Sequence, residues 1–279
     1  MVLMNFNKFT YFVKINFKKF NLANKDSYWR KHKEKIHGTD GSDEPRMPSV
    51  QVSDETKALF ETGKVLLIDK PLHWTSFDAV RKIRNSIRIK KVGHAGTLDP
   101  LATGLLIICT GKYTKKINEY MAQEKEYTGS FTLGAVTPTY DLESEPQQQK
   151  DITGIRSEMI YAATKQFTGE IQQLPPIYSA IKKQGTPLYE LARRGEEVEL
   201  QPRTIFVKEF EITNIDLPKV YFRIVCSTGT YIRSIANDFG AALGCGAYLS
   251  GLRRTRIGNF KVEDAMTMEG FMESLVHSL

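Results

Sequence analysis

A glycine-rich segment at residues 93–104 leads directly into the longest apolar run of the chain, Leu105 to Cys109. Its glycines release the backbone from the steric limits that a Cβ imposes, and Pro100 disfavours the helical conformation for the residue before it. That residue is Asp99, so we predict a loop that presents one carboxylate at the entrance of a buried strand. Leu-Asp-Pro is also ordinary turn chemistry, and from these residues alone a structural and a catalytic aspartate both remain open.

The rest of the sequence predicts strands and helices in irregular order. An apolar run at 65–68 favours a short strand, and Thr75 and Ser76 can cap a helix after it. The apolar positions of that helix follow helical spacing: Phe77, Val80, Ile83 and Ile87. Apolar and polar side chains alternate over 127–133, which is typical of a strand. We expect further helices at 113–121, 155–167, 187–194 and 231–243, and further strands at 203–214 and 219–227. Such a mixture indicates an α+β fold.

The net charge of +7 suggests a nucleic-acid partner, but its distribution is uneven. Residues 1–46 carry ten basic and five acidic side chains, which leaves only +2 for the rest of the chain. We therefore expect residues 1–60 to form a basic extension outside the fold and residues 61–279 to form one catalytic domain. An RNA-binding surface on that domain would have to come from local basic clusters, at 81–91, 182–183, 193–194 and 253–256.

Cysteine and histidine patterns exclude several classes of protein. The three cysteines, at 109, 226 and 245, are widely spaced and match neither a disulfide framework nor a metal site, which favours a reducing cytoplasm. The five histidines form no ligand pattern either, so we predict no metal. No apolar run is long enough to cross a bilayer, and we expect no membrane association.

The segment 93–104 resembles the signature of the TruB family of tRNA pseudouridine synthases, Gly-His-x-Gly-x-Leu-Asp-Pro-x-Ala-x-Gly, and fills each fixed position of it. Further blocks similar to that family occur in the family's order. They lie at 64–71 with 74–77, 125–127, 174–182 with 189–195, 228–234 and 252–255. The resemblance covers roughly residues 62 to 270 and implies a large mixed sheet flanked by helices, with a central cleft for RNA.

The resemblance implies three catalytic residues. Asp99 would be the nucleophile that attacks the sugar C1′ or the base C6, or would promote elimination at the sugar. Arg233 would be the cation that keeps this carboxylate ionised, and Tyr127 would stack on the flipped uracil and help to remove the proton at C5. Without the family blocks, a surface arginine at a helix start and a half-buried strand tyrosine would be the simpler interpretations.

Five further residues are expected to contact the substrate. By resemblance, His94 would occupy the space that the flipped base leaves, and Leu252 would form an apolar wall of the base pocket. Tyr231 would contact the nucleotide, and Asp141 would orient the base or the RNA backbone. Lys70 would meet a phosphate or, alternatively, cap the turn after the first strand.

The implied activity is isomerisation of uridine 55 in the T loop of tRNA, without a cofactor, by a monomer. Many relatives carry a small RNA-binding domain after the last block, and we expect it to be absent here. Three alternatives remain: a catalytically idle tRNA-binding protein, an RNA-guided synthase with an additional C-terminal domain, and a glycosidase with a carboxylate nucleophile. A glycosidase would need a second catalytic carboxylate.

Overall fold

A computed structural model describes residues 52–179, 181–183, 185–194, 196 and 200–276. The chain divides into a large compact unit, Met47–Pro176 with Pro202–Leu279, and a smaller one that includes Ile177–Gln201. Most of the expected basic extension lies outside the described residues.

A nine-stranded mixed sheet forms the centre of the large unit, in the order β1-β3-β10-β4-β9-β8-β5, with β2 on β3 and β11 on β10. The strands are β1 (Val65–Lys70), β2 (Val92–His94), β3 (Ala102–Thr110), β4 (Lys125–Leu133), β5 (Gly169–Gln173), β8 (Arg203–Asp216), β9 (Lys219–Cys226), β10 (Ala247–Ile257) and β11 (Phe260–Lys261). All neighbours are antiparallel except β10 and β3, which run parallel. The expected α+β class is confirmed.

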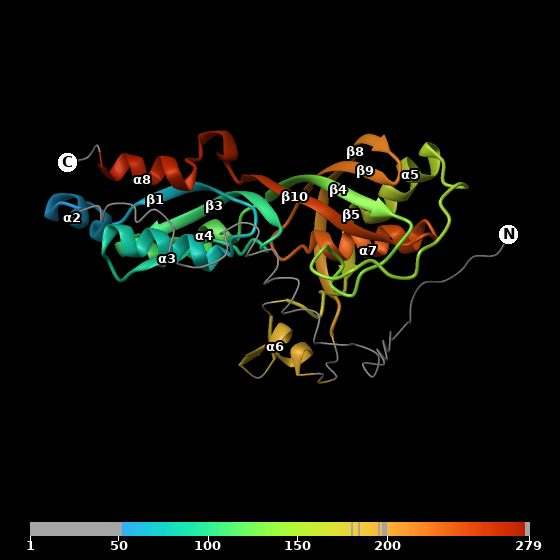
Figure 1. Cartoon of the computed structure of the whole chain (residues 1–279), viewed down its shortest axis with the longest axis horizontal. Helices are drawn as coiled ribbons and strands as arrows, with labels where there is room; N and C mark the ends of the chain where they lie inside the picture. Colours follow the sequence, from blue (N-terminus) through green and yellow to red (C-terminus); the bar gives the residue numbers. More distant parts are fainter. Residues whose placement is uncertain (1–51, 180, 184, 195, 197–199, 277–279) are drawn as a thin grey trace, which may run out of the picture. The chain divides into compact units, whose positions relative to one another are not determined.

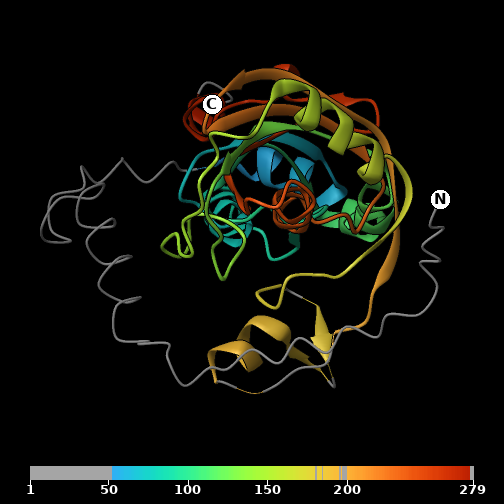
Figure 2. The ribbon, with the colours of Figure 1, turned by 90° about the vertical axis from the view of Figure 1, so that its right-hand side faces the viewer.

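Helices cover two separate stretches of this sheet. They are α2 (Asp54–Thr62), α3 (Ser76–Ile87), α4 (Ile117–Met121), α5 (Ser157–Thr164), α7 (Ile232–Ala242) and α8 (Met268–Val276), with 3-10 turns η2 (Gly111–Lys116), η3 (Lys165–Phe167) and η4 (Val262–Asp264). Figure 1 shows α3 beside β1 and β3, and α7 beside β4 and β10. Figure 2 looks nearly along α7 and shows the strands curving over it.

Each stretch has its own apolar core. Under α7, Phe131 of β4 stacks on Phe222 of β9 with ring centroids 4.3 Å apart, and Phe239 of α7 packs against Phe131. Beside α3, the buried side chains of α2, α3 and α8 meet those of β1 and β3. A helix longer and more apolar than any among the described residues would be needed to cross a membrane.

The structure corrects three expectations about the elements. Residues 54–60, expected in the extension, belong to α2, and Phe60 is buried in the core, so the fold includes them. Phe77, expected on the buried face of α3, is 57% exposed. Ala79, which is fully buried, lies on that face instead. The single helix expected at 113–121 is divided into η2 and the short α4.

The described residues of the smaller unit hold a short hairpin and one helix. Strands β6 (Lys182–Lys183) and β7 (Thr186–Pro187) pair antiparallel, and α6 (Leu188–Arg193) follows directly. The helix expected at 187–194 is therefore confirmed.

Candidate active site

The loop that carries Asp99 is held by backbone hydrogen bonds on both sides of that residue. Ser76, the first residue of α3, accepts a hydrogen bond from the Leu98 N–H (2.8 Å) and donates one to the Leu98 carbonyl (3.2 Å). The His73 N–H donates to the Pro100 carbonyl at 2.8 Å. The Asp99 side chain remains 37% exposed. A fixed backbone thus presents an accessible carboxylate, as the glycine-rich segment predicts.

Arg233, in the first turn of α7, approaches this carboxylate from within the protein. Its side chain is 6% exposed, and its Nε lies 2.9 Å from Asp99 Oδ2. Asp141 Oδ2 lies 3.7 Å from the same Nε, and Nη1 donates to the Thr139 carbonyl at 3.3 Å. The site therefore contains one buried cation between an exposed carboxylate and a buried one.

The electrostatics of this trio favour a permanently charged arginine. Burial acts to lower the pKa of Arg233, but the carboxylates of Asp99 and Asp141 outweigh it, and the pKa is raised. Burial raises the pKa of Asp141, although Arg233 and hydrogen bonds at that carboxylate oppose the shift. Asp141 contacts the arginine and is only 3% exposed, so its position fits a role in orienting Arg233 better than direct contact with RNA.

Tyr127 and Leu252 lie on the neighbouring strands β4 and β10. Both are partly buried at the margin of the core under α7. Burial raises the pKa of Tyr127; the charge of Arg254 opposes this shift and that of Asp99 adds to it. The phenol therefore lies within the electrostatic reach of the Asp99 carboxylate.

Lys70 is fully buried at the end of β1, where it caps a turn. Its Nζ donates to the carbonyls of Pro71 (3.0 Å) and Trp74 (2.6 Å). Burial lowers its pKa to about 8, against the opposing effect of Asp99. Of the two interpretations of Lys70, the structure shows turn capping and gives the side chain no access to a phosphate.

His94 and Tyr231 flank the site on other elements. Burial and the charge of Arg254 lower the pKa of His94, so its imidazole is neutral at pH 7. Tyr231 precedes α7; its N–H donates to Gln173 Oε1 (2.8 Å), and Gln173 Nε2 donates back to its carbonyl (3.0 Å). The start of α7, and with it Arg233, is thereby anchored to β5.

The basic cluster expected at 253–256 does not form a free RNA-binding surface. Arg254 is only 1% exposed. Arg253 pairs with Asp69 through contacts of 2.7 and 3.0 Å, and Arg256 pairs with Glu124 at 3.0 Å. The sequence placed Arg254 in a cluster of basic residues, but it did not predict that this side chain is buried inside the protein.

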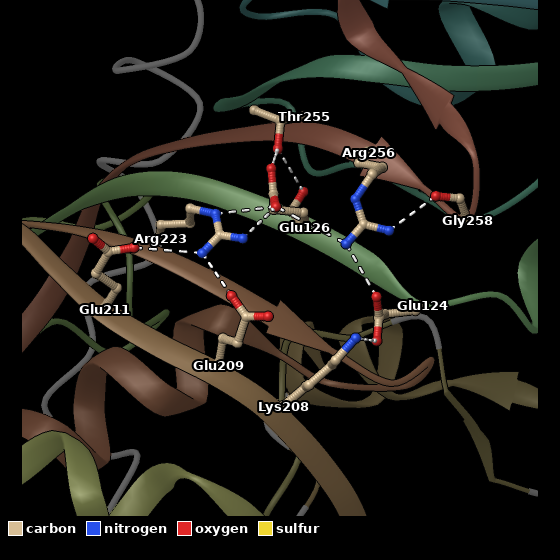
Figure 3. A network of polar contacts seen from close by, with 9 residues as sticks. All are labelled: Glu124, Glu126, Lys208, Glu209, Glu211, Arg223, Thr255, Arg256 and Gly258. Carbon is tan, nitrogen blue, oxygen red and sulfur yellow. Dashed lines mark hydrogen bonds and ion pairs between the residues drawn. The ribbon is translucent and has the colours of Figure 1, made fainter.

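Arg256 belongs to a polar network that joins β4, β8, β9 and β10 (Figure 3). Arg223 of β9 lies at its centre and bonds to Glu126 (3.0 Å), Glu209 (2.7 Å) and Glu211 (3.4 Å). Because successive strand residues point to opposite faces, Glu126 faces away from Tyr127. The cations of this face are neutralised by carboxylates, so the face offers little attraction for RNA.

Comparison with known proteins decides the family. The model of the TruB family pseudouridylate synthase N-terminal domain matches residues 84–232, and that of the tRNA pseudouridylate synthase B C-terminal domain matches residues 233–278. The chain belongs to the TruB family. The boundary between the two TruB models falls directly before Arg233, so the catalytic pair expected from the sequence joins both regions.

Two relatives in the TruB family match along nearly their whole length. The tRNA pseudouridine synthase B of Flavobacterium johnsoniae is 56% identical over 220 residues, which are 76% of this chain and 96% of the relative. That of Phocaeicola vulgatus is 50% identical over 222 residues, 77% and 94% of the two chains.

Solved structures of the same fold include the crystal structure of a Cbf5-Nop10-Gar1 complex, with a TM-score of 0.62 and 32% identity. That match covers 78% of this chain and 56% of the solved chain.

The described residues contain no group of three or more side chains suited to hold a metal ion.

Proposed function

We propose that this TruB protein isomerises uridine 55 in the T loop of tRNA to pseudouridine, with Asp99 as nucleophile. The observation that carries the proposal is an accessible carboxylate on a fixed loop, 2.9 Å from a buried arginine. It lies within a chain that shares half or more of its aligned residues with enzymes named tRNA pseudouridine synthase B.

The reaction is an isomerisation, so it needs no redox partner and no energy donor. The bond between N1 of the uracil and C1′ of the ribose breaks, the base rotates, and a bond between C5 and C1′ forms. C5 loses a proton, and N1 gains one. Asp99 attacks C1′ or C6, or promotes elimination at the sugar; all three routes are compatible with one exposed carboxylate beside Arg233.

The remaining side chains would receive and hold the extruded base. A uridine inside the T loop has to leave its stack, and protein side chains replace the lost contacts. The ring of Tyr127 and the side chain of Leu252, both partly buried, would form that pocket. Tyr127 would assist proton removal at C5, Tyr231 would contact the nucleotide, and the neutral His94 would fill the vacated space in the RNA.

The proposal also covers the oligomeric state, the need for metal or cofactor, and the cellular compartment. The enzyme acts as a monomer on the T arm, without metal or cofactor. It works in the cytoplasm, which the three buried free cysteines support because a reducing compartment keeps such thiols reduced.

The decisive experiment uses an unmodified tRNA transcript and no other macromolecule. We expect the wild-type protein to form pseudouridine at position 55 and Asp99→Asn to form none. Asp216→Asn, which removes an exposed carboxylate at the end of β8, is the matched control and should retain activity. Pseudouridine formation by Asp99→Asn would refute the nucleophile.

The same experiment separates the alternatives. Tight tRNA binding without pseudouridine would indicate a binding protein, and activity only with an added guide RNA would indicate a guided synthase. Cbf5, the similar chain in the solved structures, occurs there in a complex with Nop10 and Gar1. A glycosidase would need a second accessible carboxylate, and the side chain of Asp141 is only 5% exposed.

A further inference from the structure

Arg254 is a buried cation beside the active site for which the reaction outlined above has no use. Among the described residues it is one of the largest fully buried side chains, with 1% of its surface exposed. Burying an arginine costs several kcal/mol unless partners compensate its charge. Within the described part of the chain, its hydrogen-bond partners are backbone carbonyls, and no carboxylate forms an ion pair with it.

Two of these carbonyls belong to the Asp99 loop. Nη2 donates to the Gly96 carbonyl at 3.1 Å, and Nη1 approaches the Thr97 carbonyl at 3.5 Å. The third bond runs from Nε to the Leu105 carbonyl of β3 at 2.8 Å. The guanidinium thus ties the backbone just before Asp99 to the strand just after it.

The same guanidinium reaches the second catalytic candidate. Arg254 of β10 lies opposite Tyr127 of β4 in the strand register, so its side chain is a direct neighbour of the Tyr127 phenol. Its charge also opposes the rise in the pKa of that phenol that burial causes. One side chain therefore hydrogen bonds to the Asp99 loop and lies next to the tyrosine.

Close packing around Arg254 explains a glycine of the 93–104 segment. Gly104 has φ +100°, and a Cβ there would lie 2.3 Å from the Arg254 carbonyl oxygen. The two parallel strands approach so closely that position 104 admits no side chain. The backbone of Arg254 therefore lies directly against β3, the strand that follows the loop to which its guanidinium bonds.

We propose that Arg254 is a positioning residue that fixes the Asp99 loop and the Tyr127 phenol relative to each other. Since it is buried, it acts without touching RNA and affects the chemical step rather than binding. The inference rests on the proposed function, because it assigns Arg254 a role through Asp99 and Tyr127.

The test compares Arg254→Gln and Arg254→Lys with the wild type, using tRNA transcript. We expect Arg254→Gln to lower the single-turnover rate constant by about 100-fold, because small misplacements of catalytic groups have effects of that size. The Kd for tRNA should not change. Arg254→Lys keeps the charge but not the planar fork, so its loss should be smaller.

Hydrogen exchange provides a readout that does not depend on activity. In Arg254→Lys, backbone amides at 95–102 should exchange faster than in the wild type, while those of α7 should not. Arg223→Gln is the matched control: it removes a multiply bonded arginine from the opposite face of the sheet and should change neither exchange at 95–102 nor turnover. If Arg254→Gln does not fold, Arg254→Lys carries the test alone.

Two results would overturn the inference. Wild-type turnover in Arg254→Lys with unchanged exchange at 95–102 would show that the loop does not depend on Arg254. A weaker Kd with an unchanged rate constant would show an RNA contact instead. Asp99→Asn is assayed in parallel. If Asp99→Asn remains active, the proposed function fails; if it is inactive, only the inference about Arg254 fails.

Discussion

At the scale of single residues, the candidate site depends on charges that are removed from water. Arg233, Arg254 and Lys70 are all buried or nearly so, yet each lies close to an accessible carboxylate or to the loop that bears it. Buried charges of this kind lower the free energy of unfolding of the protein unless their partners are in place. The same residues therefore affect both the stability of the fold and the surroundings of Asp99.

Lys70 provides a direct test through the pH dependence of stability. Its pKa in the folded protein is about 8, below the ordinary value of 10.5, so between these values the unfolded chain binds the proton and the folded protein does not. The free energy of unfolding of the wild type, relative to that of Lys70→Met, should therefore rise by about 3 kcal/mol from pH 8 to pH 10.5. Denaturant unfolding of both proteins measures this difference, and a flat difference would show that Lys70 is charged in the fold at pH 9.

At the scale of elements, β10 is the strand that connects the two parts of the candidate site. It joins β3 to β4 in the sheet and carries both Leu252 and Arg254. Its parallel contact with β3 depends on Gly104, where a Cβ would lie 2.3 Å from a backbone oxygen. We expect Gly104→Ala to lower the free energy of unfolding by more than 3 kcal/mol, since both strain at φ +100° and displacement of β10 contribute.

Gly154→Ala is the matched control for this prediction. A Cβ at Gly154 would meet nothing within 4 Å, so its effect should stay within about 0.5 kcal/mol. Thermal unfolding of the two variants measures both effects. Equal stabilities of Gly104→Ala and Gly154→Ala would contradict the close approach of β3 and β10.

The sequence predicts the elements that follow simple periods and misses those that do not. The pattern at 127–133 alternates regularly and β4 is found there, whereas β10 contains a buried arginine and two register shifts against β4, so no alternation identifies it. The pairing of Asp99 with Arg233 could not be derived from local pattern either, because 134 positions separate them. Only the resemblance to a family connected the two.

At the scale of the whole molecule, the basic surface expected from clusters is smaller than the sequence indicates. The cluster at 253–256 is engaged in internal contacts, and the cations in Figure 3 are neutralised. By contrast, Arg84, Arg88 and Lys90 line one hollow at the end of α3, and none of the three forms an ion pair within the described residues. This hollow therefore gathers three cations of the expected cluster at 81–91, and we expect it to meet phosphates.

Neutralising these three side chains to Gln should weaken tRNA binding and reduce the slope of log K against log salt by about 1 per cation that contacts phosphate. Binding titrations over a series of salt concentrations measure the slope. Arg223→Gln, which removes a paired cation, should leave the slope unchanged. An unchanged slope in the triple variant would place the RNA elsewhere.

The position of β10 also has a consequence for synthesis of the protein. It lies between β3 and β4, although it comes more than 110 residues after the end of β4. Since β3 and β4 do not pair with each other, the two portions of the sheet join only after residues 247–257 have been synthesised. For most of translation, the Asp99 loop and Tyr127 therefore belong to separate portions of the nascent sheet, and β10 is the strand that joins them.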